Sequence, residues 1–186
     1  MPNWCENSLK VTGKKSEIEK MLEAIKGDDK GTVIPFDFEK ILPTPGDMAE
    51  EQSPPINIHK GRYNTQKYGE IDWWHWRVEN WKTKWNLDDS TIIDFNGKEC
   101  NIYFNTAWSP PLGIITKLSE MFPELSFKLS YLEIGMCFAG VFEANAGEVE
   151  DCCVEESKDP VAYKEIIEEY FPDTAAMLDE NEQTEE

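Results

Sequence analysis

Residues 91–106 read TIIDFNGKECNIYFNT, and this stretch decides the fold. Apolar and polar residues alternate on both sides of Asn96-Gly97, and Ile93 and Phe95 share one face of the first strand. Asn-Gly is the strongest short-range hairpin signal, because both residues tolerate the positive φ angles of a type I′ turn. The stretch therefore predicts two antiparallel strands, Thr91–Phe95 and Cys100–Thr106, joined by a tight turn.

Strand and helix patterns flank this hairpin on both sides. Before it, a strand pattern is followed by a helix pattern; after it, a helix pattern is followed by two strand patterns. The segments are residues 6–12, 16–25, 109–122, 127–132 and 136–143. Apart from an interruption before the hairpin, the order is strand, helix, strand, strand, helix, strand and one extra edge strand. This order predicts an α+β domain over residues 1–143 with a ferredoxin-like split βαβ plait.

The interruption covers about residues 28–89 and contains five of the seven tryptophans. Its first half is rich in proline, which excludes regular helix there. Its second half predicts a helix that begins at Asp72 and carries Trp74, Val78, Trp81 and Trp85 on one face. We therefore expect a Trp-rich helical insertion, packed on an edge of the sheet or on the face away from the other helices.

The C-terminal third has a different composition. Residues 144–172 predict a helical extension, since a break at residues 144–147 is followed by helical spacing from Pro160. Residues 173–186 contain six acidic residues and no basic one, which predicts a disordered acidic tail.

Charge is distributed unevenly along the chain. The net charge is −19, with −4 over residues 1–110 and −15 over residues 111–186. Such an acidic domain repels phosphate backbones, so we expect no direct nucleic-acid binding. We also expect a cytoplasmic protein without membrane contact, because no long apolar run and no signal peptide are visible.

Catalytic, metal and cofactor motifs are missing from the sequence. The five cysteines form no CxxC pair, and the two histidines, His59 and His75, are far apart. Neither a GxGxxG nor a GxxxxGK[ST] phosphate-binding loop occurs. The sequence thus predicts no cofactor, no metal site and no catalytic residue.

Four motifs, in order along the chain, resemble the YubB-like ferredoxin-like domain family of plasmid and phage proteins. They are Met1–Asn7 (MPNWCEN), Trp81–Trp85 (WKTKW), Phe104–Pro111 (FNTAWSPP) and Tyr131–Gly135 (YLEIG) with Phe138–Gly140 (FAG). The resemblance covers about residues 1–143 and implies the ferredoxin-like fold and an origin on a mobile element, but no activity. In one departure, this chain has Lys82 where the resemblance leads us to expect glycine, which puts a close backbone approach there in doubt.

The candidate binding surface consists of Trp73, Trp76, Lys84, Trp108 and Glu133. Tryptophans at helical spacing are more often core residues, but Trp73, Trp76 and Trp108 could instead form an exposed aromatic platform. Lys84 lies between two tryptophans, where a lysine usually lays its stem along the indole rings. Glu133 is the best candidate for acid–base chemistry, although a capping role beside Gly135 is favoured.

Three functional hypotheses follow. The first is a non-catalytic phage or plasmid accessory protein that binds a host protein, which could have a basic surface, through its acidic or aromatic surface. The second is a nucleic-acid mimic that inhibits a host defence or repair protein, which requires carboxylates on a rigid surface. The third is an enzyme on a ferredoxin-like plait, which a pocket lined by Glu133, Lys84 and Trp108 would favour.

Overall fold

The computed structural model describes residues 3–49 and 58–184. Parts of the N-terminal motif, the insertion and the acidic tail (residues 1–2, 50–57 and 185–186) lie outside the described residues. One six-stranded sheet, in the order β4-β5-β1-β6-β7-β8, organises the molecule. Its strands are β1 (Trp4–Thr12), β4 (Ile92–Phe95), β5 (Glu99–Ala107), β6 (Ser126–Glu133), β7 (Phe138–Asn145) and β8 (Glu148–Glu155).

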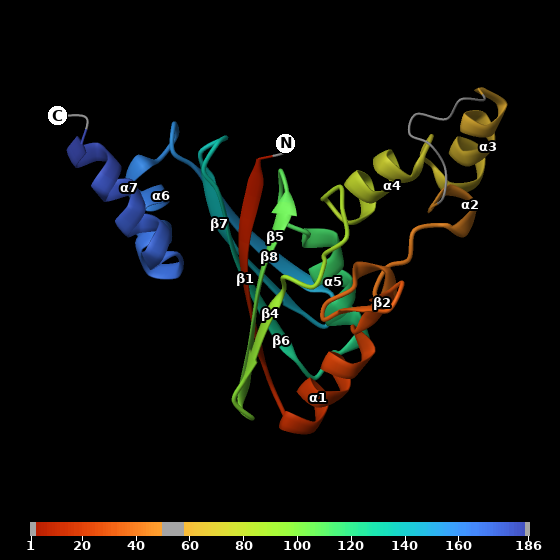
Figure 1. The fold of residues 1–186 in the computed structure, drawn as a ribbon, viewed down its shortest axis with the longest axis horizontal. Helices are drawn as coiled ribbons and strands as arrows, with labels where there is room; N and C mark the ends of the chain where they lie inside the picture. Colours follow the sequence, from red (N-terminus) through yellow and green to blue (C-terminus); the bar gives the residue numbers. More distant parts are fainter. Residues whose placement is uncertain (1–2, 50–57, 185–186) are drawn as a thin grey trace.

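The fold is α+β and ferredoxin-like, as predicted. Strands β4, β5, β1 and β6 lie side by side, and each neighbouring pair is antiparallel. Helices α1 (Lys15–Ala24) and α5 (Leu112–Met121) are the two helices of the plait, and both cover one face of the sheet (Figure 1). The predicted hairpin is β4–β5, although Gly97 adopts a positive φ of 84° and Asn96 does not, so the turn is not of type I′.

The insertion forms β2 (Gly27–Asp29), β3 (Thr32–Ile34), the short 3-10 helix η1 (Phe38–Lys40), α2 (Gly46–Ala49), α3 (Ile58–Tyr68) and α4 (Trp73–Asn80). It packs on the same face as α1 and α5, not on an edge or the opposite face as expected. The Phe36 and Phe38 rings meet Phe104 of β5 edge-on, with centroids 5.4 and 6.3 Å apart. The two plait helices leave the β4–β5 side of this face open, and the aromatic side chains of the insertion fill it.

Helix α4 is shorter than the predicted Trp-rich helix, which changes the side chains that it buries. Asp72 caps it as expected, accepting a hydrogen bond from the His75 amide at 2.9 Å. The helix ends at Asn80, and Trp81 and Lys82 follow, with Lys82 at φ 70°. Trp81 is fully buried but Val78 is 41% exposed, so the predicted apolar face is wrong.

Position 82 has the left-handed backbone that commonly ends a helix and usually requires glycine. This is the position where the family resemblance led us to expect glycine and the chain has lysine. Glycine would suit this position because the helix ends here, and the spacing of the tryptophans alone does not reveal that end.

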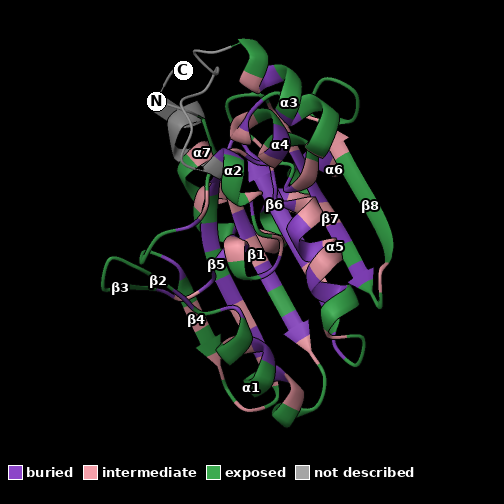
Figure 2. Ribbon diagram, turned by 90° about the vertical axis from the view of Figure 1, so that its right-hand side faces the viewer, coloured by how far each residue is buried: buried purple, intermediate pink, exposed green. Residues whose placement is uncertain are grey.

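The C-terminal third contains one strand more than the sequence predicted. The predicted break at residues 144–147 contains the turn between β7 and β8, which consists of Ala146 at φ 51° and Gly147 at φ 87°. Strand β8 carries acidic residues on an edge of the sheet, and every residue in it except Val154 is exposed (Figure 2). A strand exposed on both sides lacks the alternation that sequence patterns detect, so it was missed.

Two helices follow β8 and lie on the sheet face opposite to α1 and α5 (Figure 1). They are α6 (Pro160–Tyr170) and α7 (Pro172–Thr184). The sequence predicted a disordered acidic tail over residues 173–186, whereas the structure has the helix α7 there as far as Thr184, and its Ala175 and Leu178 pack in a second hydrophobic cluster with Tyr163 and Phe171. Among the described residues, no helix has the length and apolar character needed to cross a membrane.

Candidate functional site

Three exposed tryptophans gather at one end of the sheet and form what we call the tryptophan corner: Trp4, Trp85 and Trp108. Their side chains are 50%, 36% and 37% exposed, respectively. The Trp85 and Trp108 rings stack at a centroid distance of 6.3 Å, and Trp4 lies 6.1 Å from Trp85. Trp4 pairs with Ala107 in the β1–β5 register, so the next residue in the chain, Trp108, lies close to Trp4. Large indole surfaces left in water are unusual and mark recognition sites.

Lys84 completes this corner. Its Nζ lies 4.9 Å from the centre of the Trp85 ring, 5.1 Å from that of Trp108 and 5.6 Å from that of Trp74. The sequence placed Lys84 between Trp81 and Trp85; in the structure its Nζ lies over Trp85, together with Trp74 and Trp108 from other parts of the chain. A cation over these faces interacts favourably with their π-electrons.

The backbone that presents Trp108 is held in a sparsely populated conformation. Trp108 has φ 68°, which is costly for a bulky residue. Hydrogen bonds hold it there: the Trp108 amide donates to Asn3 O at 3.0 Å, and Thr106 Oγ1 donates to Ser109 O at 2.8 Å. The Ser109 hydroxyl donates to the carbonyl of Lys82, whose φ is also positive. Strained backbone of this kind concentrates at functional sites.

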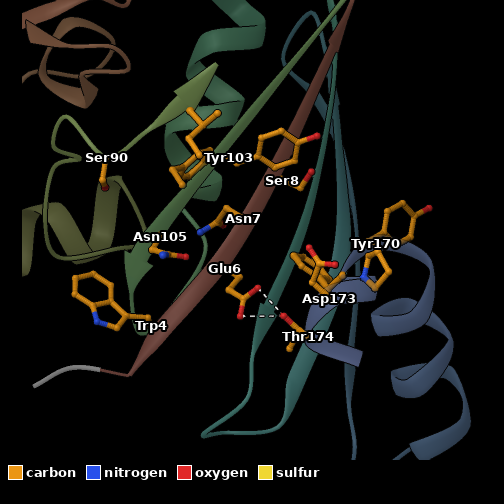
Figure 3. Close-up of a pocket in the computed structure, with 14 residues that line it drawn as sticks. Trp4, Glu6, Asn7, Ser8, Ser90, Tyr103, Asn105, Tyr170, Asp173 and Thr174 are labelled. Atoms are coloured by element: carbon orange, nitrogen blue, oxygen red, sulfur yellow. Dashed lines mark hydrogen bonds between the residues drawn. The ribbon is translucent and has the colours of Figure 1, made fainter. Parts of the chain in front are cut away.

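A trough lies beside the corner on the open face of β1 and β5. Its volume is about 680 Å³. Trp4, Glu6 and Ser8 of β1 and Tyr103 and Asn105 of β5 contribute to it, and the α6–α7 junction forms the wall opposite (Figure 3). These β1 residues alternate with the buried Cys5, Asn7 and Leu9, so the strand separates the core from the trough.

Hydrogen bonds hold the wall of the trough to its floor. Glu6 accepts a hydrogen bond from Thr174 Oγ1 at 3.1 and 3.4 Å to its two oxygens (Figure 3). Further along the face, Lys128 Nζ lies 5.2 Å from the centre of the Tyr170 ring, and Tyr170 raises the pKa of Lys128. A second hollow of about 350 Å³ lies on the other side of Trp4 and is shared with Trp85. Trp4 therefore lines both hollows and connects the trough with the rest of the tryptophan corner.

Two residues of the predicted aromatic platform lie elsewhere. Trp76 is only 8% exposed and packs edge-on against Trp81, so its prediction as part of an exposed surface is wrong. Trp73 is half-buried and stacks on the Arg77 guanidinium, 5.1 Å from the ring centre. These contacts join parts of the insertion to one another, because Arg77 of α4 also donates to Glu39 of η1 at 2.6 Å.

Glu133 is buried, with 1% of its surface exposed, at the end of β6. Its carboxylate accepts hydrogen bonds from the amides of Gly135 and Met136 at 3.1 and 2.5 Å. This is the favoured capping role. The pKa of the neighbouring Cys5 thiol is raised, first by the burial of Cys5 itself and then by the negative charge of Glu133. Neither the trough nor the second hollow beside Trp4 is lined by Glu133, Lys84 or Trp108.

The residues that sequence reasoning missed are Trp4, Trp85, Glu6 and Tyr103. Side chains alternate between the two faces of a strand, so residues 4–9 indicate that Trp4 and Glu6 share a face of β1. They do not indicate that no helix covers this face. Trp85 was assigned to a buried helix face, and only the helix stop at Lys82 removes it from that face. Within residues 3–49 and 58–184, no group of three or more His, Cys, Asp or Glu side chains is placed to hold a metal ion.

Comparison with known proteins gives one family and one solved structure. Residues 80–185 match the family model for the ferredoxin-like domain in Api92-like protein. The crystal structure of the protein Api92 from Yersinia pseudotuberculosis is similar with a TM-score of 0.53 and 10% sequence identity, over 83% of this chain and 98% of that chain. At this identity the likeness shows the fold alone. No curated protein matches the chain.

Proposed function

This chain belongs to the family of Api92-like proteins with a ferredoxin-like domain, and from that premise we propose that it is a non-catalytic accessory protein that binds a host protein. The observation that carries the proposal is the tryptophan corner. Three partly exposed indoles and a cation meet there, and a hydrogen bond from the Trp108 amide helps to hold the Trp108 backbone at positive φ. Tryptophan is among the residues that contribute most to binding energy at protein interfaces.

Negative charge supports a partner with a basic surface. Residues 111–186 carry a net charge of −15, and β8 and α6 present many of these acids on exposed positions. The acidic side chains on these elements are Glu148, Glu150, Asp151, Glu155, Glu165, Glu168 and Glu169. Such a field attracts a basic protein over distances comparable to the Debye length, about 10 Å at 0.1 M salt.

The proposal includes an origin on a plasmid or phage and action in the cytoplasm of the bacterial host. The likeness of four segments to the YubB-like family supports that origin. The host protein is then the target of an accessory function that the mobile element carries.

Affinity capture from a bacterial lysate tests the proposal. The bait is the full chain, compared with a Trp85→Ala/Trp108→Ala variant that removes most of the corner. We expect one partner at low salt, about 0.05 M, with weaker recovery at about 0.5 M because salt screens the attraction. The corner variant should recover far less of the same partner, since large aromatic contacts dominate interface energies.

Val33→Ala is the matched control, because Val33 is an exposed apolar residue outside the corner, 48% exposed. It should retain the partner. Recovery of no partner at low salt, or equal recovery by the corner variant, would contradict the proposal.

Nucleic-acid mimicry is a second candidate, and one observation favours it. The acids of β8 and α6 lie on regular secondary structure, so these carboxylates are spaced along a strand and a helix. A mimic competes with duplex DNA for its partner, so excess DNA should displace the captured protein. Deletion of residues 173–186 separates the contribution of α7 from that of β8 and α6.

An enzyme on this plait stays a third hypothesis. A thermal-shift screen with nucleotides and divalent metals tests it, because a ligand that binds the folded state raises the melting temperature. Stabilisation by one nucleotide at saturating concentration would favour catalysis over protein binding.

A further inference from the structure

The trough has an acidic end and aromatic walls, which together define a ligand chemistry. Glu6 is half-buried on its floor and Asp173 lies on its α7 wall. Neither carboxylate forms an ion pair with any residue in the described part of the chain. The Glu6 oxygens accept only the Thr174 hydroxyl among those residues, at 3.1 and 3.4 Å. A partly desolvated carboxylate with long hydrogen bonds has unused capacity to accept more.

Aromatic rings surround these acids. Trp4 is 50% exposed at one end of the trough, and Tyr103 is 44% exposed on its floor. Tyr170 stands on the wall opposite. Cations already lie over aromatic rings of this surface: Lys128 is 5.2 Å from the Tyr170 ring centre, and Lys84 lies over the neighbouring Trp85 and Trp108 rings.

Two lysines of this face, Lys10 and Lys128, lie beyond the trough and line a separate hollow of about 360 Å³. Lys10 faces Lys128 in the β1–β6 register, four residues along β1 from Glu6, or about 13 Å. Each has an acidic partner, Glu99 at 2.7 Å for Lys10 and Glu143 at 3.7 Å for Lys128. The end of the trough at Glu6 and Asp173 is therefore negative without compensation from these lysines.

We propose that this trough receives an arginine side chain of an extended protein segment. A guanidinium group is planar, stacks on indole and phenol rings and forms two parallel hydrogen bonds to a carboxylate. Glu6 supplies that carboxylate, Trp4 or Tyr103 supplies the ring, and Asn105 and Ser8 can accept the remaining donors. The volume of about 680 Å³ exceeds that of one side chain and fits several residues of an extended segment.

Charge decides against a nucleic-acid strand on the same face. Single-stranded nucleic acids bind aromatic platforms that lie in a positive groove. Here the aromatic rings stand beside Glu6 and Asp173, in a chain with a net charge of −19. A phosphate backbone would be repelled where a guanidinium group is attracted.

This inference deepens the proposed function and rests on it, since the arginine belongs to the bound protein. The test itself needs no partner. N-acetyl-arginine amide is titrated into the full ¹⁵N-labelled chain, and N-acetyl-citrulline amide, which has the same shape without the charge, is titrated in parallel. We expect shifts of the amides of Glu6, Tyr103, Asn105 and Thr174 with a dissociation constant of ~1 mM for arginine, and much weaker shifts for citrulline.

Matched variants locate the binding carboxylate. Glu6→Gln keeps the hydrogen bond to Thr174 but removes the charge, and should weaken arginine binding about tenfold. Glu165→Gln removes one charge from the exposed surface of α6, outside the trough, and should leave binding unchanged. Equal loss in both variants would show a non-specific attraction to the acidic surface and would overturn the inference.

Three further results would also overturn it: equal shifts with citrulline, shifts that map onto β8 and α6 instead of the trough, or displacement of arginine by a short oligouridine strand. If arginine does not bind the trough, the proposed binding of a partner protein through the tryptophan corner still stands. Equal capture by the parent and the corner variant, with arginine binding intact, would in contrast remove the proposed function and keep the trough.

Discussion

The two faces of the sheet share the same strands but differ in what covers them. On one face, Leu9 and Val11 of β1 are fully buried under α1, α5 and the insertion. On the other, the β1 residues Trp4 and Lys10 are exposed, and α6 and α7 cover mainly β6 and β7 through a small cluster around Tyr163 and Ile167. One face thus provides the hydrophobic stability of the fold, and the other keeps its rings and carboxylates available for binding.

Trp81 and Trp85 give the sharpest test of this difference, because they are four residues apart and lie in opposite environments. Trp81 is fully buried, and its Nε1 donates to Leu42 O at 2.7 Å. Trp81→Ala should lower the free energy of unfolding by about 3–5 kcal/mol, because it removes a large core side chain and leaves a cavity. Trp85→Ala, at an exposed position, should cost less than about 1 kcal/mol. Urea denaturation of both variants measures these values, and equal losses would contradict the assignment.

Gly140 tests how β8 is joined to the plait. A Cβ at this position would lie 2.3 Å from the Tyr131 hydroxyl, which donates to Asp151 of β8 at 2.8 Å. Gly140→Ala should therefore displace Tyr131 and destabilise the fold by about 1–3 kcal/mol.

Gly46→Ala serves as its control, because a Cβ there meets nothing within 4 Å. Thermal unfolding should place this variant within about 0.5 kcal/mol of the parent. A Gly140→Ala variant as stable as Gly46→Ala would show that the Tyr131–Asp151 contact does not fix β8.

Thr174→Val tests the contact between the open face and α7. It removes the hydroxyl that donates to Glu6 and should cost about 0.5–1.5 kcal/mol, mainly as local opening of α7. Amide hydrogen exchange should accelerate over residues 172–178 and stay unchanged in β1 and β5. Acceleration across the whole sheet would mean that α7 supports the fold rather than only the trough.

The smallest expected effect comes from Lys82, which should gain stability when its strain is relieved. Lys82→Gly suits the φ of 70° and should raise the free energy of unfolding by about 0.5 kcal/mol. Lys82→Ala keeps the unfavourable backbone and should show no gain. If both variants behave alike in urea denaturation, backbone strain does not set the geometry between α4 and the corner.

The plait was predictable because its signals are local. Asn96-Gly97 indicates the β4–β5 hairpin, and helical spacing indicates α1 and α5. Strand β8 was not predictable, since its exposed acidic residues lack a buried face. Helix α7 was missed because its apolar Ala175 and Leu178 gain partners only in the folded chain, in the cluster that contains Tyr163 and Phe171.

The candidate site was less accessible to sequence reasoning, because exposure depends on what packs against each residue. Lys84 and Trp108 were placed together in the candidate surface, and the structure brings them into contact. Trp76 and Glu133 were placed there too, but one packs against Trp81 and the other caps a turn. Trp4 belongs to the corner through the pairing of β1 with β5, a contact between residues about 100 positions apart.

Site-specific photocrosslinking tests the central claim most directly. Benzoylphenylalanine replaces Trp85 at the tryptophan corner in one variant and Val33, an exposed residue outside it, in another. After irradiation in a bacterial lysate, we expect one protein adduct from position 85 and none from position 33. Adducts of the same protein from position 33 alone, or from neither position, would contradict a binding function at the corner.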